Sequence, residues 1–282
     1  MAVAAGKLYV VATPIGNLED ITLRALRVLK EADLIAAEDT RRTRKLLSHY
    51  GIKTPLTSYH AHSPASRAED LIERLRAGVK VALVSDAGTP GFSDPGADLV
   101  ARAWEAGVRV ETVPGPAAAV AALSLSGFKG DVTFVGFLPR AEGRRVKLLQ
   151  GLTAENRVLI IFESPRRVAR TLAEIAGIMP NRQVLVVREL TKKFEEAWRG
   201  PMGQVAAQLA GVEVKGEVAL VLSCPEAQAA PAVDLKARLL AAARETGLTG
   251  RRLADLVAQE LKLPRRRVYQ ACLGLKEEKR LS

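Results

Sequence analysis

Short apolar runs alternate with segments of helical periodicity along the first half of the chain. The runs at 8–13, 34–37 and 79–84 have the length and composition of strands buried in a sheet. Residues 21–32 instead repeat apolar positions every three or four residues, and Asp20 is placed to cap the helix that this spacing predicts. The alternation of strand and helix predicts a mostly parallel sheet with helices on both of its faces.

A second set of apolar runs follows residues 127–131, which we interpret as a hinge between two domains. These runs predict strands at 132–138, 158–162, 184–190, 194–199 and 217–223. Fewer helical segments separate them, and residues 190–200 have the pattern of an antiparallel hairpin. We therefore expect a second α/β domain with a mixed sheet.

The last part of the chain has only helical periodicity. Residues 224–233 are rich in proline and alanine, which is typical of a linker, and helices are predicted at 235–245, 250–261 and 264–273. A small core is expected from five apolar positions: Leu253, Leu256, Val257, Val268 and Leu273. The pattern suits a helix-turn-helix with a turn at residues 262–264, and a helical bundle that only packs against the rest of the protein has the same pattern.

The predicted fold class is α/β. Two α/β domains are expected at 1–129 and 130–231, followed by a small C-terminal helical, helix-turn-helix-like extension at 232–282. A chain of 282 residues is long enough for this division, since domains usually have ~100–200 residues.

Two loops rich in glycine and proline follow successive predicted strands. Residues 85–96 hold three glycines, two prolines and two aspartates, and residues 113–119 form a second loop of this kind. Glycine adopts backbone angles closed to other residues, and proline fixes turns. Open α/β sheets bind ligands beyond the carboxyl ends of their strands, so the pair of loops predicts a ligand site, whereas one loop alone also fits an ordinary tight connection.

The loops lack the sequence of a phosphate cradle. The first predicted strand is followed by residues 14–20, which contain one glycine and not the Gly-x-Gly-x-x-Gly pattern of dinucleotide sites, and the Gly-x-x-x-x-Gly-Lys-Ser/Thr pattern is absent from the chain. The three histidines and two cysteines lack the spacing of metal ligands, so no metal is predicted. Cofactors that carry a pyrophosphate are disfavoured.

The chain carries a formal net charge of +11, and residues 232–282 contribute most for their length, with 12 basic and 6 acidic side chains. A basic surface gives affinity for nucleic acid without regard to sequence, and a generally basic, solvated surface is the other interpretation. No apolar run approaches the ~20 residues of a membrane span, and residues 1–7 do not have the pattern of a secretory signal. We expect a cytoplasmic protein that does not bind membranes.

Three N-terminal motifs together resemble a known family: Ala12–Ala25, Ala37–Arg41 and Ser85–Gly96. The similarity covers nearly all of residues 7–225 and continues through Val113–Ala119, Phe134–Pro139 and Phe162–Arg167. The family is that of the small-subunit (16S) ribosomal RNA cytidine 2′-O-methyltransferases, in the tetrapyrrole-methylase superfamily, whose members use S-adenosylmethionine.

The resemblance implies that S-adenosylmethionine lies between the two α/β domains. The residues that it implies as cofactor-binding are Pro14, Asp86, Ala87, Gly88, Phe92, Ala117, Ala118, Phe162, Leu190, Val218 and Ala219. This cofactor has no phosphate, so it fits loops without a phosphate cradle. The chain lacks the glycine-rich first loop and the Gly-Asp-Pro second loop of the enzymes that methylate tetrapyrroles, so a corrin substrate is disfavoured.

Glu38, Asp39 and Arg41 are candidates for substrate positioning or proton handling. A carboxylate can accept the proton of a ribose hydroxyl, and Arg41 can hold a phosphate beside the target sugar. Capping of the following helix by Asp39 or Thr40, with Arg41 in a salt bridge, explains the same residues without catalysis. Glu163 is a further carboxylate candidate, with a structural role as its alternative.

The basic extension fits a member of the family that acts on RNA, and five arginines are expected to contact phosphates: Arg251, Arg252, Arg265, Arg266 and Arg267. The expected partners are 16S ribosomal RNA or the small ribosomal subunit and, from the resemblance alone, a second copy of the chain in a homodimer. Two other functions remain open. One is a small-molecule, tetrapyrrole-like methyltransferase with the same core, and the other is a non-catalytic helix-turn-helix regulator that binds nucleic acid.

Overall fold

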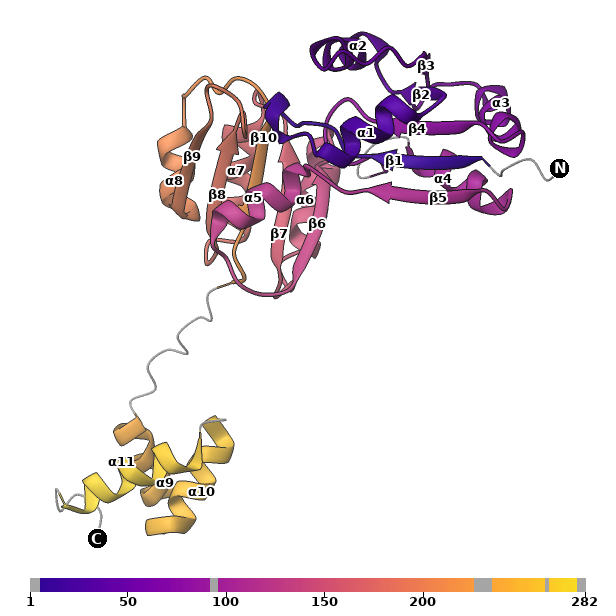
Figure 1. Cartoon of the computed structure of the whole chain (residues 1–282). Coiled ribbons are helices and arrows are strands. Elements are labelled where there is room, and N and C mark those ends of the chain that lie inside the picture. Colours follow the sequence, from indigo (N-terminus) through magenta and orange to yellow (C-terminus); the bar gives the residue numbers. More distant parts are fainter. Residues whose placement is uncertain (1–5, 92–95, 226–234, 262–263, 278–282) are drawn as a thin grey trace. The chain divides into compact units, whose positions relative to one another are not determined.

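The computed structural model of the protein describes residues 6–91, 96–225, 235–261 and 264–277. The chain divides into two compact units, Met1–Glu226 and Ala227–Ser282 (Figure 1). The first unit contains two five-stranded sheets, and the second contains helices. Most of the predicted linker, residues 226–233, lies outside the described residues.

The first sheet is parallel and has the strand order β3-β2-β4-β1-β5. Its strands are β1 (Lys7–Val11), β2 (Leu34–Ala37), β3 (Leu56–Ser58), β4 (Lys80–Val84) and β5 (Arg109–Val113). Apolar side chains of α1 (Leu23–Glu31) and α2 (Thr40–His49) pack on one face of the sheet, and those of α3 (Ala65–Arg76) and α4 (Gly96–Glu105) pack on the other. The predicted parallel sheet with helices on both faces is confirmed.

The start of α1 differs from the prediction. Thr22, and not Asp20, caps this helix, because its hydroxyl oxygen accepts a hydrogen bond of 3.1 Å from the backbone N–H of Ala25. Asp20 instead ends a short 3-10 helix, Leu18–Asp20, and its Oδ2 atom is buried without a hydrogen-bond partner. Because residues 18–20 form this 3-10 turn, α1 begins at Leu23, two residues after the predicted start at 21.

The second sheet is mixed and has the strand order β6-β7-β10-β8-β9. Its strands are β6 (Val132–Phe137), β7 (Val158–Glu163), β8 (Gln183–Arg188), β9 (Glu196–Pro201) and β10 (Val218–Leu222). Only the β6–β7 pair is parallel among the pairings of this sheet, and β8 and β9 form the predicted antiparallel hairpin. The prediction of a mixed second sheet is confirmed.

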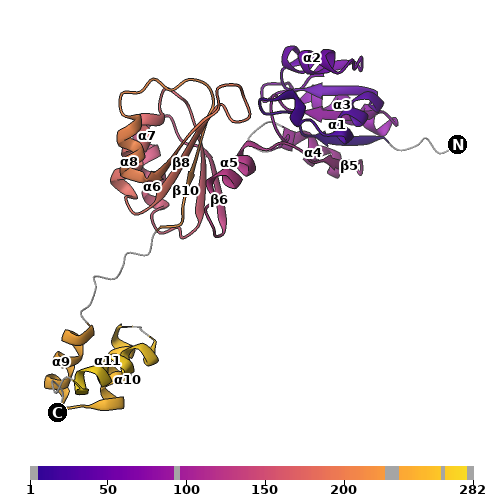
Figure 2. The same cartoon turned by 60° about the vertical axis from the view of Figure 1, so that its left-hand side comes forward.

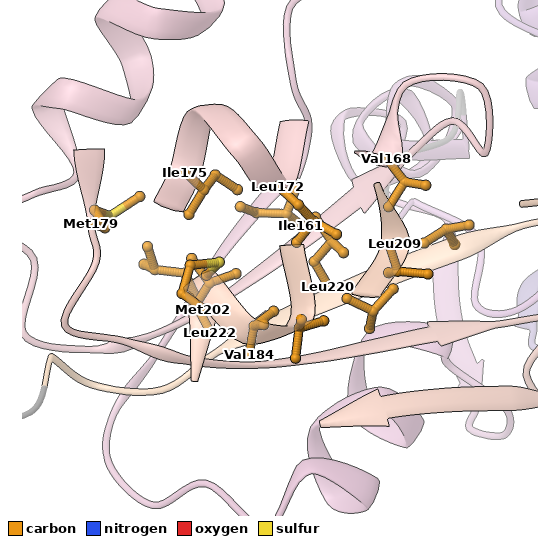
Figure 3. Packing of buried hydrophobic residues seen from close by; sticks show 14 of the residues in the cluster. Ile161, Val168, Leu172, Ile175, Met179, Val184, Met202, Leu209, Leu220 and Leu222 are labelled. Atoms are coloured by element: carbon orange, nitrogen blue, oxygen red, sulfur yellow. The ribbon is translucent and has the colours of Figure 1, made fainter. Parts of the chain in front are cut away.

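Helices cover the two faces of the second sheet unequally (Figure 2). Helices α6 (Glu142–Gly151), α7 (Val168–Ile178) and α8 (Met202–Leu209) enclose the larger core on one face, where Ile161, Leu172 and Leu220 are fully buried (Figure 3). On the other face α5 (Ala118–Ser126) packs through Ala119 and Ala122 against β8 and β10.

Helix α5 belongs by packing to the second sheet although it precedes the predicted hinge. The chain leaves the first sheet at the end of β5, crosses through residues 114–117 and enters α5 directly. The change from one sheet to the other therefore occurs before residues 127–131, which connect α5 to β6.

The second unit consists of α9 (Leu235–Thr246), α10 (Gly250–Leu261) and α11 (Arg265–Glu277), packed around a core of their own. Leu253, Val257 and Val268 are buried there, as predicted. Leu256 and Leu273 are not part of this core and are 37% and 43% exposed, which corrects the prediction. The smaller side chains of Ala254 and Cys272 occupy the inward positions instead. The predicted turn lies in part outside the described residues, because 262–263 are among those left out.

Within the parts of the chain that the structure describes, none of the helices combines the length and apolar character needed to cross a membrane.

Candidate functional site

A cavity of about 390 Å³ lies at the carboxyl ends of the strands of the first sheet. Its first wall comes from the loops that follow β1, β2, β4 and β5, and its second wall comes from β7, β8, β10 and the loops beside them. Strands β1 and β4 are neighbours, yet β1 leads to α1 on one face and β4 leads to α4 on the other. Ligands of open α/β sheets bind at such switch points.

Almost all of the cofactor-binding residues that the resemblance implied line this cavity. They are Asp86, Ala87, Gly88, Ala117, Ala118, Phe162, Leu190, Val218 and Ala219. Pro14 is buried and is not part of the lining, where its neighbour Ile15 takes its place. Phe92 lies outside the described residues.

The structure adds lining residues that sequence reasoning missed. They are Ile15, Arg42, Phe137, Ser164, Pro165, Val187, Gly216 and Glu217, and Ser85 and Thr89, from the loop already predicted at the site, also line the cavity. Several of these lie inside motifs that carried the resemblance, so their proximity to the site could have been inferred. Gly216 and Glu217 had no such signal, because they precede a strand in a segment without a motif.

The loop after β4 is fixed to the loop after β1 by a two-residue bridge. The N–H of Thr13 donates to the carbonyl oxygen of Gly88 at 2.9 Å, and the N–H of Gly88 donates to the carbonyl oxygen of Thr13 at 3.0 Å. Gly88 has a φ of +81°, in the left-handed region that favours glycine. The bridge thus depends on a backbone conformation that few other residues adopt.

Two acidic side chains meet at the cavity wall. Glu38, after β2, accepts a hydrogen bond of 3.1 Å at Oε2 from the backbone N–H of Asp86, after β4. The Oδ1 atom of Asp86 accepts one of 2.9 Å from the backbone N–H of Asp39, and its Oδ2 atom lies 3.5 Å from Arg42 Nη1. These links join the ends of neighbouring strands and give the cavity two carboxylates and one guanidinium.

Asp39 and Arg41 are not in the lining of the cavity. Asp39 caps α2 by accepting from the N–H of Arg41 at 2.8 Å, and Arg41 Nη2 lies 2.9 Å from the other carboxylate oxygen. The hydrogen bond from the Arg41 side chain is the main cause that lowers the pKa of Asp39 to about 2. The structural alternative, a capping aspartate with Arg41 in a salt bridge, describes their contacts.

Glu163 ends β7 and is among the residues that line the cavity, but its side chain is fully buried from solvent. Oε1 accepts from the N–H of Ser164 at 2.6 Å and from Arg167 Nε at 2.8 Å, and Oε2 accepts from the Thr171 hydroxyl at 2.8 Å. A carboxylate held by three residues is poorly placed to take a proton from a substrate. Its contacts describe a residue that positions Arg167 and the start of α7.

The loop between β8 and β9 forms part of the second wall and contains backbone strain. Glu189 and Thr191 have φ values of +51° and +67°, which non-glycine residues rarely adopt. Leu190 lies between them and lines the cavity. The hydroxyl of Thr191 also accepts a hydrogen bond of 3.2 Å from the N–H of Asn17 in the first wall. Strained residues of this kind concentrate at functional sites.

All five arginines expected to contact RNA are exposed in the helical unit: Arg251, Arg252, Arg265, Arg266 and Arg267. They lie in the first turns of α10 and α11. Arg265 is 3.7 Å from Asp255, and its side chain is 81% exposed. Across the described residues, no group of three or more His, Cys, Asp or Glu side chains is arranged to hold a metal ion.

Several known proteins are similar in sequence to this chain. Residues 7–206 match the family model of the tetrapyrrole (corrin/porphyrin) methylases. A protein of Thermotoga maritima named ribosomal RNA small subunit methyltransferase I is 48% identical over 222 residues, which are 78% of this chain and 100% of that protein. A protein of the same name from Synechocystis is 44% identical over 277 residues, 97% of this chain and 99% of its own.

Solved structures show the same fold at lower identity. A cobalt-precorrin-4 methyltransferase has a TM-score of 0.59 at 18% identity, covering 77% of this chain and 94% of its own. A uroporphyrin-III C-methyltransferase of Thermus thermophilus, complexed with S-adenosyl homocysteine, has a TM-score of 0.55 at 22% identity, covering 77% and 97%. The chain belongs to the tetrapyrrole methylase family, in the group of proteins named ribosomal RNA small subunit methyltransferase I.

Proposed function

We propose that this protein transfers a methyl group from S-adenosylmethionine to the 2′-oxygen of a cytidine in 16S ribosomal RNA. The observation that carries the proposal is the cavity at the strand ends, lined by the residues implied for the cofactor, in a chain 44–48% identical to proteins named ribosomal RNA small subunit methyltransferase I. The basic helical unit supports an RNA substrate over a tetrapyrrole one.

The residues of the cavity fit this cofactor in size and charge. A volume of about 390 Å³ is in the range of sites for small molecules. S-Adenosylmethionine carries positive charge on its sulfonium and ammonium groups, and the wall offers the carboxylates of Glu38 and Asp86. Alanine, valine and leucine side chains form much of the remaining wall, which suits the apolar faces of a nucleoside. Asp86, Gly88 and Ala118 would hold the cofactor from the first wall, and Phe162, Leu190 and Ala219 from the second.

When bound, the cofactor supplies a methyl group already activated by the sulfonium. The protein has to hold the ribose hydroxyl next to it and accept the hydroxyl proton, and such alignment is worth up to about 7–11 kcal/mol in intramolecular models. Glu38 is our candidate for the proton acceptor, because it lines the cavity, whereas Asp39 is paired with Arg41 and Glu163 is enclosed. Arg41, whose side chain is 84% exposed, remains a candidate for a phosphate contact.

The helical unit is proposed to bind RNA phosphates through its exposed arginines. The Thermotoga maritima relative matches over its whole length and leaves about a fifth of this chain without a counterpart, which is close to the share of the helical unit. This suggests that the unit adds affinity for the substrate and that the first unit carries the chemistry. A cytoplasmic location follows from a ribosomal substrate.

A homodimer is also proposed, and sedimentation at micromolar concentration tests it. Helix α5 supports it, because Val120 and Leu125 are 63% and 46% exposed on a helix made of seven apolar residues and two serines. A species of only ~30 kDa, the mass of one chain at 30.3 kDa, would contradict the homodimer.

The function is tested by transfer of labelled methyl groups to small ribosomal subunits that lack the modification, followed by mapping of the modified ribose. Naked 16S RNA, a tetrapyrrole and duplex DNA serve as competing substrates or ligands. Transfer to one cytidine 2′-oxygen is expected, and Glu38→Gln should lower kcat at saturating cofactor by about 10²- to 10⁴-fold, the usual contribution of a general base. Methylation of the tetrapyrrole alone, or DNA binding without any transfer, would replace the proposal by one of its alternatives.

A further inference from the structure

One aromatic side chain at the cavity is far more exposed than a packing role requires. Phe137 ends β6, lines the cavity and is 65% exposed. Exposed apolar surface of this size costs free energy in water, roughly 25 cal/mol for each Å² left unburied. Phe162, which also lines the cavity, lies next to it with ring centroids 5.5 Å apart, and the ring of Phe134 contacts that of Phe162 with centroids 5.2 Å apart.

A β-bulge places Phe137 on this face of the sheet. Phe134 is paired with Ile160 and Phe137 with Phe162, so three residues of β6 span two residues of β7. Side chains alternate along a regular strand, and Phe134 and Phe137 would then point to opposite faces. The extra residue brings both rings to the face of Phe162, and Gly136 allows the bulge with a φ of +73°.

Two arginine side chains hold the backbone of the segment after Phe137 in place. Arg145, only 3% exposed, donates to the carbonyl oxygens of Pro139 and Arg140 at 3.3 and 3.1 Å. Arg167 donates to the carbonyl oxygens of Pro139 and Leu138 at 3.4 and 3.2 Å and is itself held by Glu163. The Phe137 ring is therefore exposed because hydrogen bonds fix the backbone that follows it, and not because it lies at the end of a mobile loop.

Two exposed cations lie close in the sequence to lining residues of this part of the cavity, and a third lies in the lining. Arg140 is exposed three residues after Phe137, and Arg166 is exposed directly after the lining residues Ser164 and Pro165. Arg42 lines the opposite wall with its side chain 61% exposed. A flat apolar ring beside scattered guanidinium groups is the combination with which proteins hold single-stranded RNA, since bases stack on the ring and phosphates contact the cations.

From this we infer that Phe137 is the stacking platform for the base of the nucleotide being methylated, which is turned out of its RNA strand. The inference rests on the proposed function and names a residue that positions the target ribose. Phe137 is exposed whereas Phe134 and Phe162 are partly buried, so of the three rings it is the most open to a partner that comes from outside the cavity. A base from the RNA meets this condition better than the adenine of the cofactor.

The test compares Phe137→Ala, Phe137→Leu and Phe137→Trp with wild type, using unmodified small ribosomal subunits and S-adenosylmethionine. Phe194→Ala is the matched control, because Phe194 is also an exposed phenylalanine, at 67%, and is not in the cavity lining. Loss of a base stack should lower kcat/KM for the subunit by about 5- to 150-fold in Phe137→Ala. Phe137→Leu keeps an apolar side chain but has no π-face, so its kcat/KM should fall nearly as much as that of Phe137→Ala. Phe137→Trp keeps an aromatic ring and should have a kcat/KM close to that of wild type. The Kd for S-adenosylmethionine, measured by calorimetry, should stay within about twofold of wild type in all three variants. If the ring stacked on the adenine of the cofactor, its loss would raise this Kd by about 5-fold or more.

Three results would overturn the inference. Equal kcat/KM in Phe137→Ala and Phe194→Ala would mean that no base stacks on the ring. A weakened affinity for S-adenosylmethionine in Phe137→Ala would assign the ring to the cofactor, and a lower mass in sedimentation would assign it to an interface between copies. If wild type itself transfers no methyl group to the subunit, the proposed function fails first and the inference fails with it.

Discussion

The left-handed backbone at Gly88 offers a direct test of the cofactor site. In Gly88→Ala, the new Cβ atom would lie 3.4 Å from Ile15 Cγ2 and 3.6 Å from the Pro116 carbonyl oxygen, which are ordinary contacts. Space therefore does not oppose the substitution, and its cost comes from a φ of +81°, about 1–3 kcal/mol for a residue with a side chain. If the bridge to Thr13 survives, the backbone strain lowers the free energy of unfolding. If the loop moves to relieve the strain, the affinity for the cofactor falls instead.

We expect both losses, with the free energy of unfolding reduced by about 1–2 kcal/mol and the Kd for S-adenosylmethionine raised by about 5- to 30-fold. Gly107→Ala is the matched control. Gly107 has a φ of +69°, has open space at the Cβ position and lies in the turn between α4 and β5, away from the cavity lining. Urea denaturation and calorimetry measure the two quantities. Gly88→Val, with two further methyl groups, should bind the cofactor even more weakly.

Both variants should lose a similar amount of stability, because both glycines have a left-handed backbone, so the reasoning would be refuted if Gly88→Ala bound S-adenosylmethionine as tightly as Gly107→Ala. The loop after β4 would then be a tight connection like any other, and the cofactor site would have to be sought elsewhere. A Gly88→Ala variant that bound normally and lost no stability would show instead that the backbone is not left-handed at this position.

Three further predictions use other parts of the chain. Arg145→Met should lower the free energy of unfolding by about 1.5–3 kcal/mol in urea denaturation, because the buried Arg145 makes two charge-assisted hydrogen bonds to Glu174 and one each to the carbonyl oxygens of Pro139 and Arg140; a loss below 1 kcal/mol would contradict this role. Burial and a hydrogen bond to Asp98 raise the pKa of Tyr59 to about 12. The stability that this hydroxyl contributes is therefore present below about pH 10 and is lost as the pH rises towards 12. In Tyr59→Phe, the free energy of unfolding measured by urea denaturation should fall less steeply with pH over this range. Deleting residues 232–282 should weaken RNA binding and reduce its salt slope by about 0.7 for each lost phosphate contact, with cofactor binding nearly unchanged, and wild-type methylation by the truncated protein at all salt concentrations would contradict an RNA-binding role.

Much of the first sheet could be predicted because its signals are local. Strand β2 has the predicted bounds 34–37, since a short apolar run between polar residues is enough to define a buried strand. Residues 85–89 were placed at the site for the same reason, as they follow a buried strand directly. Helices of the second domain were underestimated, because α6 and α7 mix charged and apolar residues around partly buried arginines such as Arg145.

The rest of the site depends on contacts between residues that are distant in the sequence. The roles of Glu38 and Asp39 could not be separated from their adjacent positions, and only their contacts place Glu38 at the cavity and Asp39 at the cap of α2. Glu163 was a catalytic candidate until Arg167 and Thr171, four and eight residues later, were seen to enclose it. The exposure of Phe137 depends on a bulge, which alternation along a strand cannot reveal.

Some features of the site are common to proteins with this fold, and others are additions of this chain. Structures of corrin and porphyrin enzymes superpose at TM-scores of 0.55–0.59 with only 18–22% identity, so two sheets with a cavity at the strand ends do not choose the substrate. Choice has to come from residues at the rim of the cavity and from parts outside the shared fold. We propose that in this chain those are Phe137, the exposed Arg140 and Arg166, and the basic helical unit. Substitution of Phe137 should therefore lower methyl transfer to the small ribosomal subunit while leaving cofactor affinity intact, whereas changes at Gly88 or Asp86 should lower cofactor affinity whatever the substrate.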